Sequence, residues 1–202
     1  MAIQSFLEGY KAFREEFHRD RANFFRALVD RGQNPDVMVI ACSDSRVDPA
    51  IIGKAEPGEF FVVRNVANLV LPYGSNSIYD GTSSAIEFAV RDLEVKDIIL
   101  LGHTHCGGIK RFCECDQKNK ERVFVDNWMS NIENVNDGGL EGEERLRYVE
   151  KESIKLSLGN LMTFPWLKER VHEGKLDLHG WLFDLEKCAI LKYLAPYGWE
   201  NL

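Results

Sequence analysis

Two short polar stretches of the chain contain residue types that bind transition metals. Cys42 closes the apolar run at residues 37–41, and His103 and Cys106 follow the apolar run at residues 98–101. Two thiolates and one imidazole suit a tetrahedral zinc ion whose fourth position stays open for water. A structural zinc site has four protein ligands, so this set of three predicts a catalytic zinc site.

The residues around Cys106 strengthen this prediction. Gly107 and Gly108 follow it, which allows a tight turn and leaves backbone N–H groups free to stabilise a thiolate or a developing oxyanion. His105 is the alternative imidazole ligand. Because adjacent side chains seldom chelate one ion well, we expect Cys106 to bind the metal and His105 to be a partly buried, hydrogen-bonded histidine.

Asp44 and Arg46 lie just past Cys42. A carboxylate at this position can bind zinc directly or accept a hydrogen bond from zinc-bound hydroxide. A bidentate pair with Arg46 would hold Asp44 away from the metal. An ion pair that only stabilises the loop is the alternative, but the position beside Cys42 favours a role in the chemistry.

The remaining cysteines give a weaker signal. Cys113-x-Cys115 could form a second metal site or a redox pair, but the polar residues around it favour an exposed loop after a helix. Five cysteines cannot all pair in intramolecular disulfides, which favours a reducing compartment. With no signal-peptide pattern at the N-terminus, we predict a cytoplasmic protein.

The elements that position these residues follow from hydrophobic patterning. The apolar runs 37–41, 60–63 and 98–101 are typical of strands buried on both faces, and the apolar spacing of residues 86–93 predicts a helix that begins near Asp80. Strand, helix and strand in this order predict an α/β fold with a mostly parallel central sheet flanked by helices. Cys42 and His103 then lie at the carboxyl ends of two strands, where ligands bind in such sheets.

The whole chain, residues 1–202, is predicted to form one domain. Residues 1–34 are a helical arm with aromatic residues at helical spacing, and residues 35–202 are the zinc-binding core. The arm packs either on its own core or on a second subunit. After Gly107 we expect mainly helices, with an acidic, solvated stretch from Glu141 to Glu152. Residues 175–183 and 188–194 are expected to add a strand at the sheet edge and a terminal segment.

Charge and hydrophobic patterning argue against two classes of protein, those that mainly bind nucleic acid and those that span a membrane. The net charge of -7 argues against nucleic acid as the main partner. No apolar run approaches the roughly 20 residues that a membrane span needs. A chain of 202 residues with 45% hydrophobic residues is typical of a globular protein with a sizeable core.

Taken together, these motifs resemble those of the β-class carbonic anhydrases. The resemblance covers Cys-x-Asp-x-Arg at residues 42–46, His-x-x-Cys-Gly-Gly at residues 103–108, and the segments 56–68 and 158–165. It implies reversible hydration of CO2 to bicarbonate and a proton by zinc-bound hydroxide, with CO2 and bicarbonate as the small-molecule partners. It also implies Cys42, His103 and Cys106 as zinc ligands, and Asp44 with Arg46 as the catalytic pair.

Within that family the chain looks like the plant-type branch. Gln33 stands nine residues before Cys42, where that branch has a glutamine that faces the substrate. Phe61, Val66 and Gly107 match further pocket positions, whereas Phe88 replaces a tyrosine and so removes one pocket hydrogen bond. The family builds its pocket between subunits, which implies a homodimer or a multiple of dimers.

Two other functions remain open at this point. The apolar wall of Phe61, Val66 and Phe88 would also admit carbonyl sulfide or carbon disulfide, so the same scaffold could hydrolyse these molecules. A zinc-binding module without catalytic activity is the other alternative, although it would need neither Gln33 nor the pair of Asp44 and Arg46. Val39 stands where one branch of the family has a tryptophan that favours a closed site, so we expect Asp44 to pair with Arg46 and leave the metal open.

Overall fold

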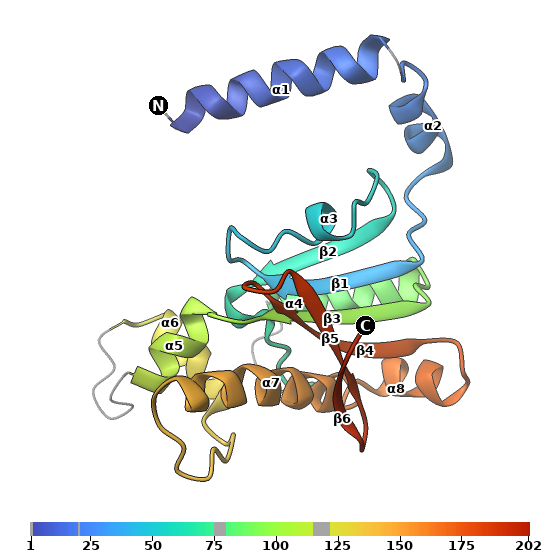
Figure 1. Ribbon diagram of the computed structural model, residues 1–202. Coiled ribbons are helices and arrows are strands. Elements are labelled where there is room, and N and C mark those ends of the chain that lie inside the picture. Colours follow the sequence, from blue (N-terminus) through green and yellow to red (C-terminus); the bar gives the residue numbers. More distant parts are fainter. Residues whose placement is uncertain (1, 20, 75–79, 115–121) are drawn as a thin grey trace. The chain divides into compact units, whose positions relative to one another are not determined.

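The structure of the protein is a computed structural model that describes residues 2–19, 21–74, 80–114 and 122–202 (Figure 1). Two compact units, Met1–Asn34 and Pro35–Leu202, make up the chain. The organisation as a single domain stays a prediction. None of the helices in the described segments combines the length and the apolar character needed to cross a bilayer.

The N-terminal unit is helical, as expected for the arm, and contains α1 (Ala2–Arg19) and α2 (Phe24–Arg31). Their aromatic rings pack on one another, with centroids 4.9 Å apart for Phe17 and Phe25, and the guanidinium of Arg21 lies 3.9 Å from the ring centre of Phe24. The apolar residues nearer the N-terminus remain exposed, including Phe6 at 72% of its surface.

A six-stranded sheet is the centre of the larger unit, and its strands follow the order β2-β1-β3-β4-β5-β6. Neighbours among the first four strands of this order run parallel, whereas β5 and β6 are antiparallel to their neighbours. The predicted α/β fold with a mostly parallel sheet is therefore confirmed. The strands are β1 (Val37–Cys42), β2 (Phe60–Asn65), β3 (Asp97–His103), β4 (Asp177–Asp184), β5 (Ala189–Leu194) and β6 (Gly198–Asn201).

Two predictions about the sheet are wrong. Strand β2 is an edge strand and is only partly buried, because its apolar run meets a neighbouring strand on one side alone. The run at 175–183 forms β4 in the interior of the sheet, because the C-terminal segment folds back as the β5–β6 hairpin and becomes the edge instead.

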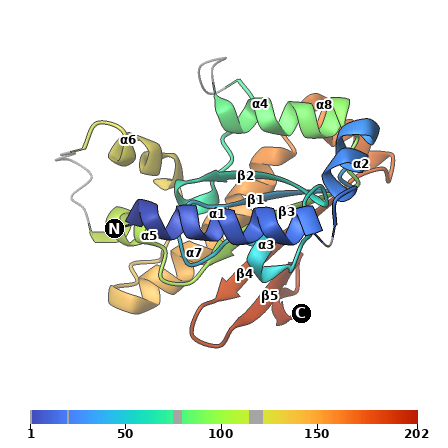
Figure 2. The same ribbon diagram turned by 90° about the horizontal axis from the view of Figure 1, so that it is seen from above.

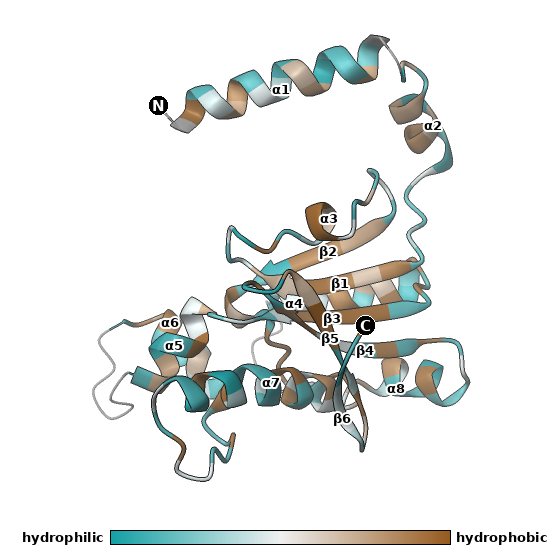
Figure 3. Cartoon of the chain, viewed as in Figure 1, coloured by the Kyte–Doolittle hydropathy of each residue, from teal (hydrophilic) through white to brown (hydrophobic). Residues whose placement is uncertain are grey.

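Within the larger unit, several helices cover one face of the sheet, and one short helix lies on the other face (Figures 1 and 2). On one face, side chains such as Ile40 and Leu100 pack against Ile86 of α4 (Gly81–Glu87), Ile154 of α7 (Gly142–Leu161) and Leu167 of α8 (Pro165–His172). Each fully buried aliphatic side chain contributes roughly 1.5–3 kcal/mol to stability. On the other face, the short α3 (Pro49–Ile52) adds to a smaller cluster. Figure 3 shows the apolar strands in brown between helices with teal polar faces.

The helix predicted to begin near Asp80 is confirmed. The Asp80 carboxylate accepts hydrogen bonds from the backbone N–H groups of Thr82 and Ser83, so it caps α4. After Glu87 the helix widens into one π-helical stretch, Phe88–Asp92. The segment after Gly107 is mainly helical, as expected, with α5 (Gly107–Glu114) and α6 (Val125–Met129), which ends in a 3-10 turn at Ser130–Ile132.

Candidate metal centre

Two loops at the carboxyl ends of neighbouring strands form the site. The first ligand loop, residues 42–46, begins where β1 ends, and the second ligand loop, residues 103–106, begins where β3 ends. Because β1 and β3 are adjacent and parallel, with Ala41 opposite Leu101, both loops emerge at the same edge of the sheet.

Cys42, His103 and Cys106 form a buried group able to hold a metal ion. Their ligand atoms all lie within 4.8 Å of one another, and the two sulfur atoms are 3.9 Å apart. Tetrahedral zinc with Zn–S bonds of about 2.3 Å would place two sulfurs about 3.8 Å apart. The separation observed therefore suits zinc without rearrangement of the loops.

The imidazole of His103 is oriented for the same purpose. Its Nδ1–H donates to the Thr104 carbonyl at 2.8 Å, which leaves the lone pair on Nε2. That buried Nε2 atom has no hydrogen-bond partner among the described residues. Since a buried polar atom without a partner is costly, a metal ion at this position would satisfy it.

The two thiols affect each other's ionisation. A hydrogen bond from Cys106 lowers the pKa of Cys42 to about 4, although burial opposes the charged form. The same contact, together with burial, raises the pKa of Cys106. The contact thus favours a thiolate on one sulfur and a proton on the other, and a divalent cation would displace that proton.

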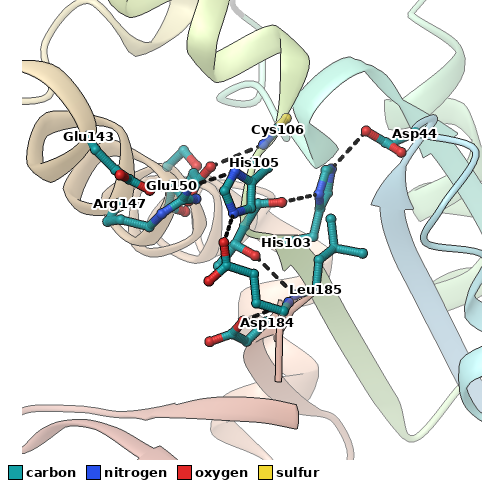
Figure 4. A network of polar contacts seen from close by, with 12 residues as sticks. Asp44, His103, His105, Cys106, Glu143, Arg147, Glu150, Asp184 and Leu185 are labelled. Carbon is teal, nitrogen blue, oxygen red and sulfur yellow. Dashed lines mark hydrogen bonds and ion pairs between the residues drawn. The ribbon is translucent and has the colours of Figure 1, made fainter. Parts of the chain in front are cut away.

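Asp44 and Arg46 form a bidentate ion pair beside the metal group. The Arg46 Nε and Nη2 atoms donate to the two carboxylate oxygens of Asp44 at 2.9 and 2.7 Å, and the Arg46 backbone N–H donates at 3.0 Å. These hydrogen bonds hold the pKa of Asp44 well below its usual range. Asp44 Oδ2 lies 3.9 Å from His103 Nε2 (Figure 4), so an acceptor oxygen is held next to the position that a metal would occupy.

The first ligand loop is fixed by Arg64 of β2. Its guanidinium donates to the backbone carbonyls of Cys42 and Asp44 at 2.9 and 2.7 Å, and to the Asp48 carboxylate at 2.7 Å. Hydrogen bonds to charged groups contribute about 1.5–3 kcal/mol each. No specific role was predicted for Arg64 from the sequence. The available signal was its position directly after the apolar run at residues 60–63, which is predicted to be a strand.

The second ligand loop is held by side chains that come from two distant segments (Figure 4). Glu150 of α7 accepts the Cys106 N–H at 3.0 Å, and Thr104 Oγ1 accepts the Leu185 N–H at 3.0 Å. The ring of His105 contacts Arg147 at Nδ1 and Glu186 at Nε2, each at 2.8 Å. His105 has hydrogen bonds at both ring nitrogens, as expected, and is not part of the metal group, but it is exposed and not partly buried.

Glu150 contradicts one expectation from the sequence. The stretch Glu141–Glu152 was predicted to be solvated, but Glu150 is only 3% exposed, because it lies on the side of α7 that faces the sheet and the second ligand loop. Burial raises the pKa of Glu150, although the Cys106 N–H and Arg147 counteract it. The spacing of Arg147 and Glu150, one helical turn, was the only sign in the sequence that this carboxylate has a partner.

The predicted pocket residues are partly brought together. The rings of Phe61 and Phe88 have centroids 5.9 Å apart, and Val66 packs so closely on the start of α5 that a Cβ atom at Gly108 would come within 2.7 Å of it. Gly107 is the first residue of α5. Gln33 belongs to the N-terminal unit, and its role stays a prediction.

A cavity of about 710 Å³ adjoins the metal group on the side of α5 and α7. It differs from the predicted apolar pocket because charged side chains line much of it. Its lining includes Arg46, His105 and Cys106 of the two ligand loops, together with Arg145, Arg147 and Glu150 of α7. Cys113 also lines it, and burial raises the pKa of this thiol, which disfavours a reactive cysteine. Cys115, and with it the Cys113-x-Cys115 prediction, lies outside the described residues.

Comparisons with known proteins agree with this geometry. Residues 37–190 match a family model described as carbonic anhydrase. A carbonic anhydrase of Synechocystis sp. is 36% identical over 197 residues, which cover 95% of this chain and 71% of that protein. Beta carbonic anhydrase 5, chloroplastic, of Arabidopsis thaliana is 34% identical over 94% of this chain. The chain spans 64% of that plant protein.

Solved structures show the same similarity. The structure of the β-carbonic anhydrase CcaA superposes with a TM-score of 0.91 at 34% identity and covers 100% of this chain and 91% of that one. A tetrameric β-carbonic anhydrase from Sordaria macrospora has a TM-score of 0.81 at 30% identity, with 95% of this chain and 96% of that one covered.

Proposed function

Since the chain belongs to the β-class carbonic anhydrases, we propose that it catalyses the reversible hydration of CO2 to bicarbonate and a proton, with zinc as its cofactor. The observation that carries this proposal is the buried group of Cys42, His103 and Cys106, in which Nε2 of the histidine has no hydrogen-bond partner within the described part of the chain. When bound, zinc supplies a Lewis acid that lowers the pKa of a water molecule and makes it a nucleophile.

The residues of the first ligand loop orient the reaction. Asp44 accepts a hydrogen bond from the attacking oxygen and so directs a lone pair of that oxygen towards the carbon of CO2. Arg46 holds Asp44 in this role, because both carboxylate oxygens are engaged by its guanidinium. The new C–O bond gives bicarbonate, and the proton lost from water leaves to buffer.

Substrate recognition is assigned to apolar contacts. We assign Phe61, Val66 and Phe88 to an apolar wall that suits a small, uncharged molecule, and the contact between the rings of Phe61 and Phe88 supports this; Gly107 at the start of α5 is assigned to the same pocket. Gln33 is proposed to donate a hydrogen bond to the substrate oxygen as negative charge develops there. This set of residues corresponds to the plant-type branch of the family.

A stopped-flow assay of CO2 hydration with zinc analysis on the same sample tests the proposal. We expect one zinc ion per chain and activity that is lost on chelation and regained with zinc. Activity should climb towards alkaline pH, because two thiolates weaken zinc as a Lewis acid. A chain with stoichiometric zinc that turns over carbonyl sulfide but not CO2 would establish the hydrolase instead, and one inert towards both would be a binding module.

We further propose that the active form is a homodimer or a multiple of dimers in the cytoplasm. The support is the exposed apolar side of α1, where Ile3, Phe6 and Tyr10 are each more than half exposed. Deletion of residues 1–30 should then dissociate the assembly in sedimentation and lower activity. A fully active monomer would contradict this, and cell fractionation tests the location.

A further inference from the structure

A buried carboxylate contacts the metal group from outside it. Glu150 lies in the middle of α7, and its side chain is 1% exposed. Removing a carboxylate from water is unfavourable unless partners compensate for the lost hydration. The contacts of Glu150 therefore indicate why this carboxylate is buried.

Glu150 uses its two oxygens for two different partners. Oε1 accepts the backbone N–H of Cys106 at 3.0 Å, and Oε2 accepts Nη1 of Arg147 at 2.6 Å. Cys106 immediately precedes α5, so its N–H has no partner within that helix. Glu150 is therefore the group that fixes the direction of this N–H.

Arg147 also contacts His105, the residue that precedes Cys106. Its Nη2 atom lies 2.8 Å from Nδ1 of His105, a residue whose φ of 58° is in the left-handed region. Residues other than glycine adopt this conformation only where surrounding contacts impose it. Glu150 thus holds the N–H of the peptide between His105 and Cys106, and Arg147 holds the His105 ring, while Arg46 Nη2 donates to the carbonyl of the same peptide at 3.0 Å.

We propose that Glu150, supported by Arg147, is a positioning residue that fixes Cys106 so that its thiolate meets zinc, an inference that rests on the zinc chemistry proposed above. A buried ion pair adds little to stability relative to apolar packing. Its value here is geometric, because rotation of the peptide between His105 and Cys106 would move the sulfur atom away from its 3.9 Å contact with Cys42.

The substitution Glu150→Gln tests this role with almost no change in shape. A carboxylate accepts hydrogen bonds at both oxygens, whereas an amide accepts at only one, so the variant must lose either the Cys106 contact or the Arg147 contact. We expect zinc affinity to fall by about 10–100-fold, the usual effect of removing a group that orients a metal ligand. Competition with a chromophoric chelator measures the affinity, and the visible absorption of the cobalt(II) protein should change in intensity as the thiolate geometry changes.

Two further variants keep the result interpretable. Glu152→Gln makes the same change two residues further along α7, where the carboxylate pairs with Lys155, and should leave affinity and cobalt absorption unchanged. Arg147→Lys should lower zinc affinity, because an ammonium group cannot contact Glu150 and His105 as the guanidinium does.

Unchanged zinc affinity and cobalt absorption in a folded Glu150→Gln protein would overturn the proposal. Should that variant not fold, unchanged values for Arg147→Lys would overturn it in the same way. Neither readout involves CO2, so a failure of the hydration assay would contradict the proposed function while leaving the role of Glu150 to be decided by metal binding.

Discussion

The two ligand loops are held in place by opposite charges. The first ligand loop turns its backbone carbonyls towards the Arg64 guanidinium, and the second turns the Cys106 N–H towards the Glu150 carboxylate. In each case a backbone group that the sheet or helix leaves unpaired is satisfied by a charged side chain from a neighbouring element. In this site, backbone carbonyls near a metal ligand are therefore held by a cationic side chain, and a backbone N–H is held by an anionic one.

The loops also differ in how far away their supports lie. The first loop carries its own ion pair, Asp44 with Arg46, within two residues. The second depends on Glu150, 44 residues from Cys106, and on Glu186, 81 residues from His105. Substitutions in the pair of Asp44 and Arg46 should thus alter mainly the chemistry, with zinc in place, whereas loss of the contact between Glu150 and Cys106 should alter metal binding.

The largest effect is expected from the ligand itself. Cys106→Ser replaces a thiolate with a hydroxyl group that binds zinc poorly, so zinc affinity should fall by more than about 100-fold and CO2 hydration should disappear with it. Metal analysis after dialysis checks this. Cys188→Ser, at an exposed position outside the metal group, is the matched control. Full activity with stoichiometric zinc in Cys106→Ser would refute the ligand assignment.

The next largest effect tests whether the first loop acts on chemistry alone. Arg46→Ala frees Asp44 to approach the metal, and we expect activity to fall by on the order of 100-fold while zinc stays bound. Stopped-flow rates and metal content of the same preparation separate the two quantities. Parallel loss of zinc and activity would mean that the pair only stabilises the loop.

A third substitution compares the supports directly. Arg64→Lys retains the charge but loses the fork that reaches two carbonyls and Asp48, so zinc affinity should fall by about tenfold. Chelator competition measures it alongside Glu150→Gln. Arg91→Lys, in a surface pair with Glu87, is the control that should show no change. Equal affinities in both lysine variants would show that the first loop needs no support from β2.

The smallest effect is expected at the outer contact of the second loop. Glu186→Gln weakens a contact between His105 and a carboxylate that is 69% exposed, and such pairs contribute about 0–1 kcal/mol. The free energy of unfolding in urea should fall by less than about 1 kcal/mol, with zinc affinity nearly unchanged. A loss as large as that of Glu150→Gln would place the main support of the loop in the β4–β5 turn.

Much of the site could be predicted because its signals are local. The apolar runs before Cys42 and His103 indicate strands whatever the rest of the chain does, and the spacing of Asp44 and Arg46 permits an ion pair within one loop. The helix cap at Asp80 is local in the same way, since it depends on the two residues that follow. The position of β4 inside the sheet is not local, because it depends on whether later segments fold back beside it.

The sequence by itself determined the donor atoms, the strand, helix and strand that carry them, and the family to which the motifs belong. Only the tertiary structure decided that Glu150 is buried, that Arg64 contacts the first loop, and that a charged cavity adjoins Cys106. The physical reason is that a pattern of residue types specifies backbone conformation over a few residues. The burial of a charged side chain and the choice of its partner depend on which distant elements pack against it.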